Sequence, residues 1–294
     1  MIWLIGCKGM LGTEIARQLS ENKMNFVGTD IDVDITNPQA LSEFANGKDI
    51  SYIINCSAYT AVDKAESDAE FAKKLNEDGP RNISKLANQI HAKMVHISTD
   101  YVFDGTGNVP YTEDTPVAPI GVYGKTKAAG EDAVRQNLKE YYIIRTAWLY
   151  GWAGKNFVYT MIKAMNTHDS VKVVNDQKGS PTFAGDLASV IIKIINKNDV
   201  PYGTYHCTDL GKITWRDFTN EIKKIGVEKG IITNKECVVN PCTTDDYPTP
   251  AKRPAYSVLS KDKIQKTLNI KLPEWKESLK KFMNSELFDK NRIM

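Results

Sequence analysis

The sequence lacks several features that mark specialised classes of protein. None of its apolar runs approaches the roughly 20 residues of a membrane-spanning helix, so we expect no membrane contact. Its five cysteines are scattered and never form C-x-x-C, which argues against a disulfide framework and a zinc site. The apolar N-terminus carries no basic segment, so we expect a buried strand rather than a signal peptide, and a cytoplasmic location.

The composition gives no sign of a nucleic-acid partner. The chain has 38 basic and 36 acidic residues, a formal net charge of +2, and no dense basic run. Hydrophobic residues make up 41% of the 294 residues, as in an ordinary folded protein. This length allows either two lobes or one large domain.

The first half of the chain alternates short apolar runs with helical patterns. Such alternation predicts an α/β fold, a doubly wound parallel sheet covered by helices on both faces. The predicted strands are 2–5, 25–29, 52–54, 93–97 and 142–144. The predicted helices are 10–19, 38–45, 66–74, 79–89 and 125–137.

The second half is less regular and predicts a smaller C-terminal lobe, interleaved with the sheet. Thr214 is the expected N-cap of one of its helices. The stretch 241–254 is rich in proline and threonine, which predicts a long loop. The predicted helices are 157–165, 187–195, 215–225 and 273–282, with a strand at 204–207.

A glycine-rich turn follows the first predicted strand. Gly6, Gly9 and Gly12 have the spacing G-x-x-G-x-x-G and lead directly into a helix. Glycines in this context let the backbone approach a pyrophosphate, and the helix N-terminus supplies free N–H groups. We therefore interpret residues 1–150 as a dinucleotide-binding Rossmann domain, and 151–294 as mainly a substrate-binding lobe.

Asp30 ends the second predicted strand, where an acidic residue meets the adenosine ribose of a bound dinucleotide. A carboxylate at this place bonds both ribose hydroxyls and repels a 2′-phosphate. The sequence therefore favours NADH over NADPH without excluding NADPH.

Tyr123 and Lys127 are four residues apart, which places them on one face of a helix. A nearby ammonium is expected to lower the pKa of the phenol, so that Tyr123 can exchange a proton with a substrate oxygen. Thr99 closes the strand at 93–97, at the edge where ligands of parallel sheets bind. These three residues form a candidate catalytic set: Thr99 orients a carbonyl, Tyr123 gives a proton, and Lys127 also bonds the nicotinamide ribose.

Together these motifs resemble the dTDP-4-dehydrorhamnose reductases, a family of extended short-chain dehydrogenases. The resemblance covers nearly the whole chain. It is carried by the segments 6–12, 55–66, 97–105, 123–127, 145–148, 175–182 and 253–257. It implies reduction of the 4-keto group of dTDP-4-dehydro-L-rhamnose by NADH or NADPH, with Tyr123 as the proton donor.

The resemblance also assigns binding residues. It implies that Met10, Leu11 and Gly12 contact the pyrophosphate. Other residues would contact the adenosine or line the cofactor groove: Asp30, Asp34, Ile35, Ala58, Tyr59 and Thr60. The sugar-nucleotide would meet Thr99, Asp100, Trp148 and Arg253.

One departure concerns a metal. Some family members bind Mg²⁺ at a dimer interface through a glutamate that resembles Glu14 and a second glutamate. Gly185 stands where that second glutamate is expected, and Asp186 comes one residue late. We therefore predict no metal, and either a monomer or a homodimer.

Two alternatives remain open at this point. One is another sugar-nucleotide enzyme on the same fold, such as an epimerase or a reductase of a different 4-keto sugar. The other is a non-catalytic binding protein, because the regulatory subunit of methionine adenosyltransferase is similar across these motifs.

Overall fold

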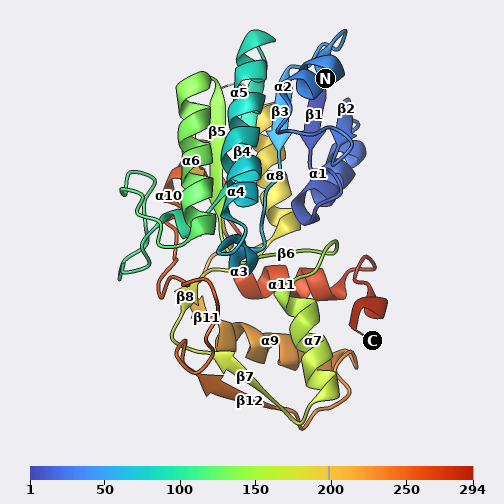
Figure 1. Cartoon of the computed structure of the whole chain (residues 1–294). Helices are drawn as coiled ribbons and strands as arrows, with labels where there is room; N and C mark the ends of the chain where they lie inside the picture. The colour runs from blue at the N-terminus through green and yellow to red at the C-terminus, as the bar shows by residue number, and fades with distance from the viewer. Residues whose placement is uncertain (198, 294) are drawn as a thin grey trace.

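Six short strands form one parallel sheet, which confirms the predicted fold class (Figure 1). The computed structural model of the protein describes residues 1–197 and 199–293. The strand order is β10-β5-β4-β3-β1-β2. The bounds are β1 Ile2–Ile5, β2 Phe26–Thr29, β3 Tyr52–Asn55, β4 Lys93–Thr99, β5 Tyr141–Thr146 and β10 Gly203–His206.

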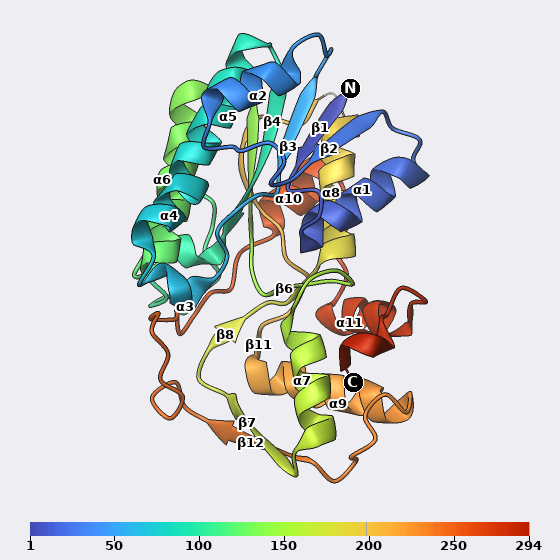
Figure 2. The same ribbon diagram turned by 45° about the vertical axis from the view of Figure 1, so that its right-hand side comes forward.

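Helices cover both faces of this sheet (Figure 2). On one face α1 (Met10–Glu21) packs against α8 (Ala184–Asn196). On the other face lie α2 (Pro38–Ala45), α5 (Gly79–Gln89) and α6 (Val122–Asn137). The sheet is therefore shielded from water on both sides, as a parallel sheet needs.

The central strand β1 shows why its residues are apolar throughout. Successive side chains of a strand point to opposite faces. Ile2 and Leu4 pack into the cluster that contains α1 and α8, whereas Trp3 and Ile5 pack into the cluster under α2 and α5. All four side chains are at most 5% exposed, so both faces of this strand are buried. A strand that is buried on both faces needs an apolar residue at every position.

The second half of the chain contributes to the sheet layer. The edge strand β10 pairs in parallel with β5, in the register Gly203 with Tyr142. Helix α8 and the short α10 (Asp262–Leu268) add apolar side chains to the core on one face of the sheet.

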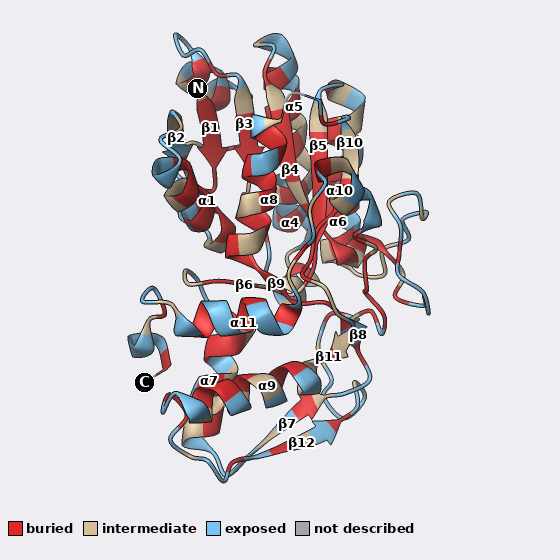
Figure 3. Cartoon of the chain, turned by 180° about the vertical axis from the view of Figure 1, so that it is seen from behind, coloured by how far each residue is buried: buried red, intermediate tan, exposed pale blue. Residues whose placement is uncertain are grey.

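The smaller unit has a core of its own, shown by the buried residues of α7, α9 and α11 in Figure 3. Its helices are α7 (Phe157–Thr167), α9 (Trp215–Glu228) and α11 (Trp275–Asn284). Three pairs of strands accompany them: β7 Ser170–Val174 with β12 Val238–Cys242, β6 Leu149–Tyr150 with β9 Thr182–Phe183, and β8 Lys178–Gly179 with β11 Ile213–Thr214. Thr214 caps α9 in a full capping box with Asp217, which confirms the predicted cap.

Several elements differ from the prediction. Helix α6 begins three residues early, at Val122, so Tyr123 lies in its first turn. The helix predicted at 66–74 is shorter, α4 (Ala69–Lys73), and a separate short helix, α3 (Val62–Ala65), precedes it. A π-helical turn (Lys74–Asp78) then leads into α5, and 3₁₀ turns lie at Asp100–Val102 and Lys290–Ile293.

The loop predicted at 241–254 starts two residues late, because Pro241 and Cys242 belong to β12. Proline is tolerated there since β12 lies in a sheet of two strands, where both strands are edges. Helix α10 lies at a place where no helix was predicted.

The carboxyl ends of the large sheet face the smaller unit (Figure 1). The strand order also reverses beside β1, since β2 lies on one side of it and β3 on the other. In open α/β sheets this reversal creates a crevice for ligands. Among the described residues no helix has the combined length and apolar character that crossing a membrane requires.

Helix α8 is expected to be essential for the core of the sheet layer. Ile191 is fully buried, so Ile191→Ala should lower the free energy of unfolding by about 2–5 kcal/mol. Lys193→Ala on the same helix removes an exposed side chain and should change it by less than about 0.5 kcal/mol. Urea unfolding followed by circular dichroism measures the free energy of unfolding of both variants. Equal decreases would contradict the burial of Ile191 in the core.

Candidate active site

The glycine turn packs closely against the start of α1. Gly6 follows β1 with φ of +77°, and a Cβ at this position would lie 2.8 Å from the backbone nitrogen of Ser57. A Cβ on Gly12 would lie 2.0 Å from the carbonyl oxygen of Gly6. Gly9 caps α1 without a side-chain hydrogen bond to the helix. Only glycine allows these close backbone contacts. The turn therefore brings bare backbone next to the free N–H groups at the start of α1, where a pyrophosphate can bind.

The two residues after Gly9 differ in their surroundings. Leu11 is buried in the core between α1 and α8, so only its backbone can reach a ligand. Met10 is partly exposed, and its side chain lies against Gly151 and Gly154, which follow β6.

The acidic residues after β2 lie beside this turn. Asp30 Oδ2 accepts a hydrogen bond from the backbone N–H of Lys8 at 3.0 Å, so its carboxylate is tied to the glycine turn. Asp34 is exposed, and its Oδ1 accepts hydrogen bonds from the backbone and hydroxyl of Thr36. Ile35 is buried in the core under α2 and α5.

The segment after β3 is held mainly by its backbone. Asn76 Oδ1 accepts from the N–H of Tyr59 at 2.8 Å, and its Nδ2 donates to the carbonyl of the same residue at 3.1 Å. The Tyr59 phenol donates to Asp68 Oδ2 and is therefore already bonded within the protein. Ala58 is partly buried and Thr60 is exposed.

The candidate catalytic residues come together at the end of β4. Thr99 Oγ1 donates to Asp100 Oδ1 at 2.9 Å, and its hydroxyl lies near enough to the Tyr123 phenol to influence the pKa of Tyr123. Lys127 is 2% exposed, and its Nζ donates to the carbonyl of Ile97 at 2.6 Å. Strand β4 and helix α6 therefore bring these side chains together, at the carboxyl edge of the sheet.

The expected effect of Lys127 on Tyr123 is wrong for this structure. Burial raises the pKa of Tyr123 to about 12, the charge of Asp100 adds to this, and the nearby hydroxyl of Thr99 opposes it. Removing water from the phenolate outweighs a lysine whose ammonium group is held by a backbone carbonyl. Tyr123 is consequently fully protonated near neutral pH, as a proton donor must be.

Lys127 and Asp100 are also shifted by burial. Burial lowers the pKa of Lys127 to about 8, and the negative charge of Glu131 opposes this shift. Burial raises the pKa of Asp100 to about 6, and its Oδ2 has no hydrogen-bond partner among the described residues. An unpartnered buried carboxylate oxygen is free to accept from a bound hydroxyl.

Trp148 follows β5 in a strained backbone conformation. Its φ is +48°, in the left-handed region that bulky residues rarely adopt. Its ring stacks on Trp215 with centroids 3.6 Å apart and planes 11° from parallel. A Cβ on Gly179 would lie 2.5 Å from the Trp148 ring, so the two tryptophans are packed tightly from behind.

Arg253 forms an ion pair within the chain. Its Nη1 and Nη2 donate to the two carboxylate oxygens of Asp63 at 2.9 and 2.8 Å. This pair joins the segment after β12 to α3, which follows β3. The guanidinium side chain is 25% exposed, so part of it still faces solvent.

Three residues of this region were missed by the sequence analysis: Asp63, Trp215 and Glu131. Glu131 repeats the four-residue spacing that links Tyr123 to Lys127, and this periodicity could have identified it. For Asp63 and Trp215 no local pattern was available, because their partners lie 190 and 67 positions away along the chain.

The two acidic residues considered for a metal have protein partners. Glu14 pairs with Arg17 and accepts from Gln18, whereas Asp186 pairs with Lys281 and accepts from Ser278. Across residues 1–197 and 199–293 no group of three His, Cys, Asp or Glu side chains is arranged to hold a metal ion. The expectation that no metal is needed stays a prediction.

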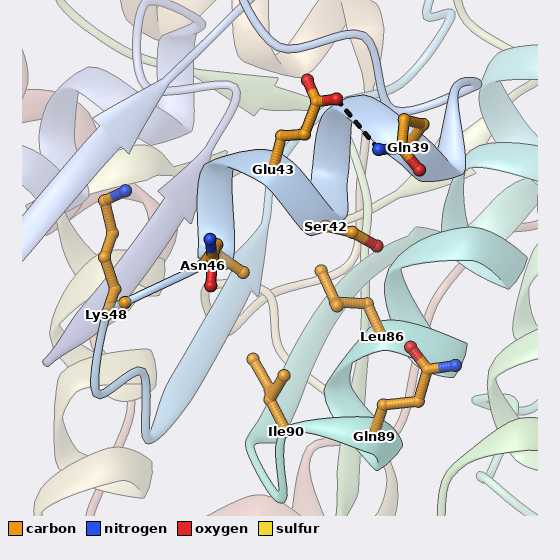
Figure 4. Close-up of a pocket in the computed structure, with 10 residues that line it drawn as sticks. Gln39, Ser42, Glu43, Asn46, Lys48, Leu86, Gln89 and Ile90 are labelled. Atoms are coloured by element: carbon orange, nitrogen blue, oxygen red, sulfur yellow. Dashed lines mark hydrogen bonds between the residues drawn. The ribbon is translucent and has the colours of Figure 1, made fainter.

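A separate hollow of about 550 Å³ lies between α2 and α5 (Figure 4). It is lined by Gln39, Glu43, Lys48, Gln89 and Ile90, among others. These residues lead into the amino ends of β3 and β4. The hollow is therefore at the opposite edge of the sheet from the candidate catalytic residues.

Comparisons with known proteins agree with this arrangement. Residues 1–288 match the family described as RmlD substrate binding domain. The dTDP-4-dehydrorhamnose reductase of Escherichia coli K12 is 38% identical over 99% of both chains. The solved dTDP-4-dehydrorhamnose reductase of Clostridium acetobutylicum is 46% identical, with a TM-score of 0.90 over 96% of this chain and 98% of that chain. The Bacillus anthracis structure of the same name, in complex with NADP, is 35% identical with a TM-score of 0.89 and the same coverage.

The raised pKa of Asp100 predicts a pH-dependent effect on stability. Between the unfolded pKa of about 3.8 and the folded pKa of about 6, only the folded state keeps the proton. The wild type should therefore lose about 2–3 kcal/mol relative to Asp100→Asn as pH rises from 4 to 8.

Urea unfolding of both proteins at several pH values measures this difference. Asp104→Asn is the control, because hydrogen bonds from Thr106 and Tyr111 lower the pKa of Asp104, so its effect on stability has the opposite sign and lies mainly below about pH 4. Parallel pH curves for wild type and Asp100→Asn would contradict the prediction.

Proposed function

The chain belongs to the dTDP-4-dehydrorhamnose reductase family, and we propose that it reduces dTDP-4-dehydro-L-rhamnose to dTDP-L-rhamnose with a nicotinamide cofactor. The convergence of Thr99, Tyr123 and Lys127 at the carboxyl edge of the sheet is the observation that carries this proposal. Further support comes from relatives that bear this enzyme's name across their full length.

The cofactor would lie across the reversal of strand order, with its pyrophosphate on the glycine turn. Gly6, Gly9 and Gly12 leave the backbone bare there, and Met10 and Leu11 offer N–H groups of the first turn of α1. The adenosine would meet Asp30, Asp34 and Ile35, and the groove would continue along Ala58, Tyr59 and Thr60. For Tyr59 this contact would be through its backbone, because its phenol is bonded to Asp68.

Asp30 leads us to propose a preference for NADH. Its carboxylate lies against the glycine turn, where it can accept from ribose hydroxyls and repel a 2′-phosphate. The relative from Bacillus anthracis was solved with NADP, so the preference has to be measured for this chain.

The protein's part in the reaction is to place a ketone and supply a proton. The bound reduced nicotinamide supplies a hydride to C4 of the sugar. Tyr123, kept protonated by its high pKa, gives its proton to the ketone oxygen. Lys127 lies one turn further along α6, where its ammonium group can stabilise the phenolate that remains and hold the ribose.

The sugar-nucleotide would lie between the sheet edge and the smaller unit. Thr99 and Asp100 would bond the sugar, since a buried oxygen of Asp100 is unpartnered within the described residues. Trp148 would form an apolar wall for the sugar. Arg253, which is partly exposed beside Asp63, would meet the diphosphate. On this view residues 1–150 bind the cofactor and residues 151–294 bind mainly the substrate.

Loss of the phenol should abolish most of the turnover. Tyr123→Phe is expected to reduce kcat by about 10²–10⁴-fold, because the positioned proton donor is removed while the ring remains. The measurement is oxidation of NADH, read at 340 nm, with dTDP-4-dehydro-L-rhamnose as substrate.

Tyr202→Phe is the matched control, since this phenol is exposed and bonded to Glu140 at the other edge of the sheet. Near-normal turnover by Tyr123→Phe would remove Tyr123 as the donor. Epimerised product without net loss of NADH would favour an epimerase, and binding of a methionine adenosyltransferase without turnover would favour a regulatory subunit.

The cofactor preference gives a second test. Asp30→Asn should lower the ratio of kcat/KM for NADH to that for NADPH by about 10-fold or more, since a hydrogen bond to a charged acceptor is lost together with its repulsion of phosphate. Asp32→Asn is the control, because this neighbouring carboxylate accepts the backbone N–H of Asp30 instead. An unchanged ratio for Asp30→Asn would show that another residue sets the preference.

A further inference from the structure

A carboxylate with no exposed surface lies one helical turn beyond Lys127. Glu131 is 0% exposed and accepts two hydrogen bonds from Arg145, from Nε at 2.8 Å and from Nη2 at 2.7 Å. Arg135, one turn further along α6, also donates to Glu131 Oε2 at 2.7 Å. Two arginines therefore bind one buried carboxylate directly behind the candidate active site.

This carboxylate joins α6 to β5, which pairs with β4. Arg145 is on β5, and it is paired in the sheet with Ser98 of β4, the residue before Thr99. Helix α6 carries Tyr123 and Lys127, so the ion pair fixes the helix that bears these two side chains against β5, the neighbour of the strand that bears Thr99. A bidentate pair of this kind sets position and angle together.

The surroundings of Glu131 are rich in basic groups. His96 and His206 are buried within this cluster, and each has its pKa lowered, by burial first and then by Lys127 or Arg145, so both are neutral. Two positive charges, Lys127 and Arg145, are therefore buried beside one negative charge. The other titratable groups that face this cluster are Cys56, Glu113, Lys263 and the partly exposed Arg135.

The charge of Glu131 acts on Lys127 directly. It opposes the burial that lowers the pKa of Lys127 to about 8. If the negative charge were removed, a buried ammonium and a buried guanidinium would be left without a counter-ion. Arginine does not give up its proton in proteins, so the relief comes from Lys127, which would become neutral.

We propose that Glu131 is a positioning residue of this enzyme, which keeps Lys127 charged and in place through its ion pair with Arg145. The inference rests on the proposed function, in which a charged Lys127 stabilises the phenolate of Tyr123 and holds the ribose. The proposed role concerns the ionisation of Lys127, which can be measured without substrate or cofactor.

The direct test is the titration of Lys127 by NMR in ¹³C,¹⁵N-lysine-labelled protein, with the signal assigned by its loss in Lys127→Met. In wild type the midpoint is expected near pH 8. Glu131→Gln should lower it by about one pH unit or more, because burial is then unopposed. Arg135→Gln should raise it by a few tenths of a unit, because Glu131 then loses one of its two cations.

Two controls separate this role from a purely structural one. Asp132→Asn changes an exposed carboxylate of the same helix that also pairs with Arg135, and should leave the midpoint of Lys127 unchanged. The decrease of kcat/KM at alkaline pH should shift in the same direction as the titration midpoint of Lys127 in each variant.

The outcomes are distinguishable. Midpoints that are unchanged in both Glu131→Gln and Arg135→Gln would overturn the proposal, even if turnover falls. If Glu131→Gln does not fold, the upward shift in Arg135→Gln decides, because that arginine is partly exposed and its loss should be tolerated. Shifted midpoints in a protein that turns over no sugar-nucleotide would support the role of Glu131 and reject the proposed function.

Discussion

The parallel pairing of the central strands is the constraint on which the whole site depends. It brings the carboxyl ends of β1, β3, β4 and β5 to one edge, facing the smaller unit. Thr99 is the last residue of β4. The glycine turn and the segment at 58–60 begin within three residues of the ends of β1 and β3, and Trp148 lies within three residues of the end of β5. Residues that are far apart in the sequence therefore meet because of the order and direction of the strands in the sheet.

Burial sets the chemistry at this edge. It raises the pKa of Tyr123 and Asp100 and lowers that of Lys127, in each case by disfavouring the charged form. The consequence is a phenol that holds its proton, and a lysine whose charge depends on its neighbours. Glu131, which is bound to Arg145, supplies the negative charge that favours a charged Lys127. Groups that would not touch a ligand therefore also influence the electrostatics of the site.

Most of the sheet layer could be predicted from the sequence, because the apolar runs of the first half are the strands β1 to β5 and its amphipathic stretches, apart from 66–74, are helices. Predictions failed where a contact was non-local or the environment mattered. The pKa of Tyr123 was expected to fall because spacing shows a nearby lysine, but spacing does not show exclusion of water. The sequence also did not show that Tyr59 would line a groove through its backbone. Its phenol donates a hydrogen bond to Asp68 within the protein.

The sequence by itself determined the order of strands and helices, the glycine turn and the helical spacing of Tyr123, Lys127 and Glu131, because these follow from local periodicity and backbone sterics. Only the tertiary structure decided that Glu131 binds Arg145 and that Arg253 pairs with Asp63. The reason is that a charge's partner and its burial depend on which distant segments pack against it, and neither is encoded in any single stretch of the chain.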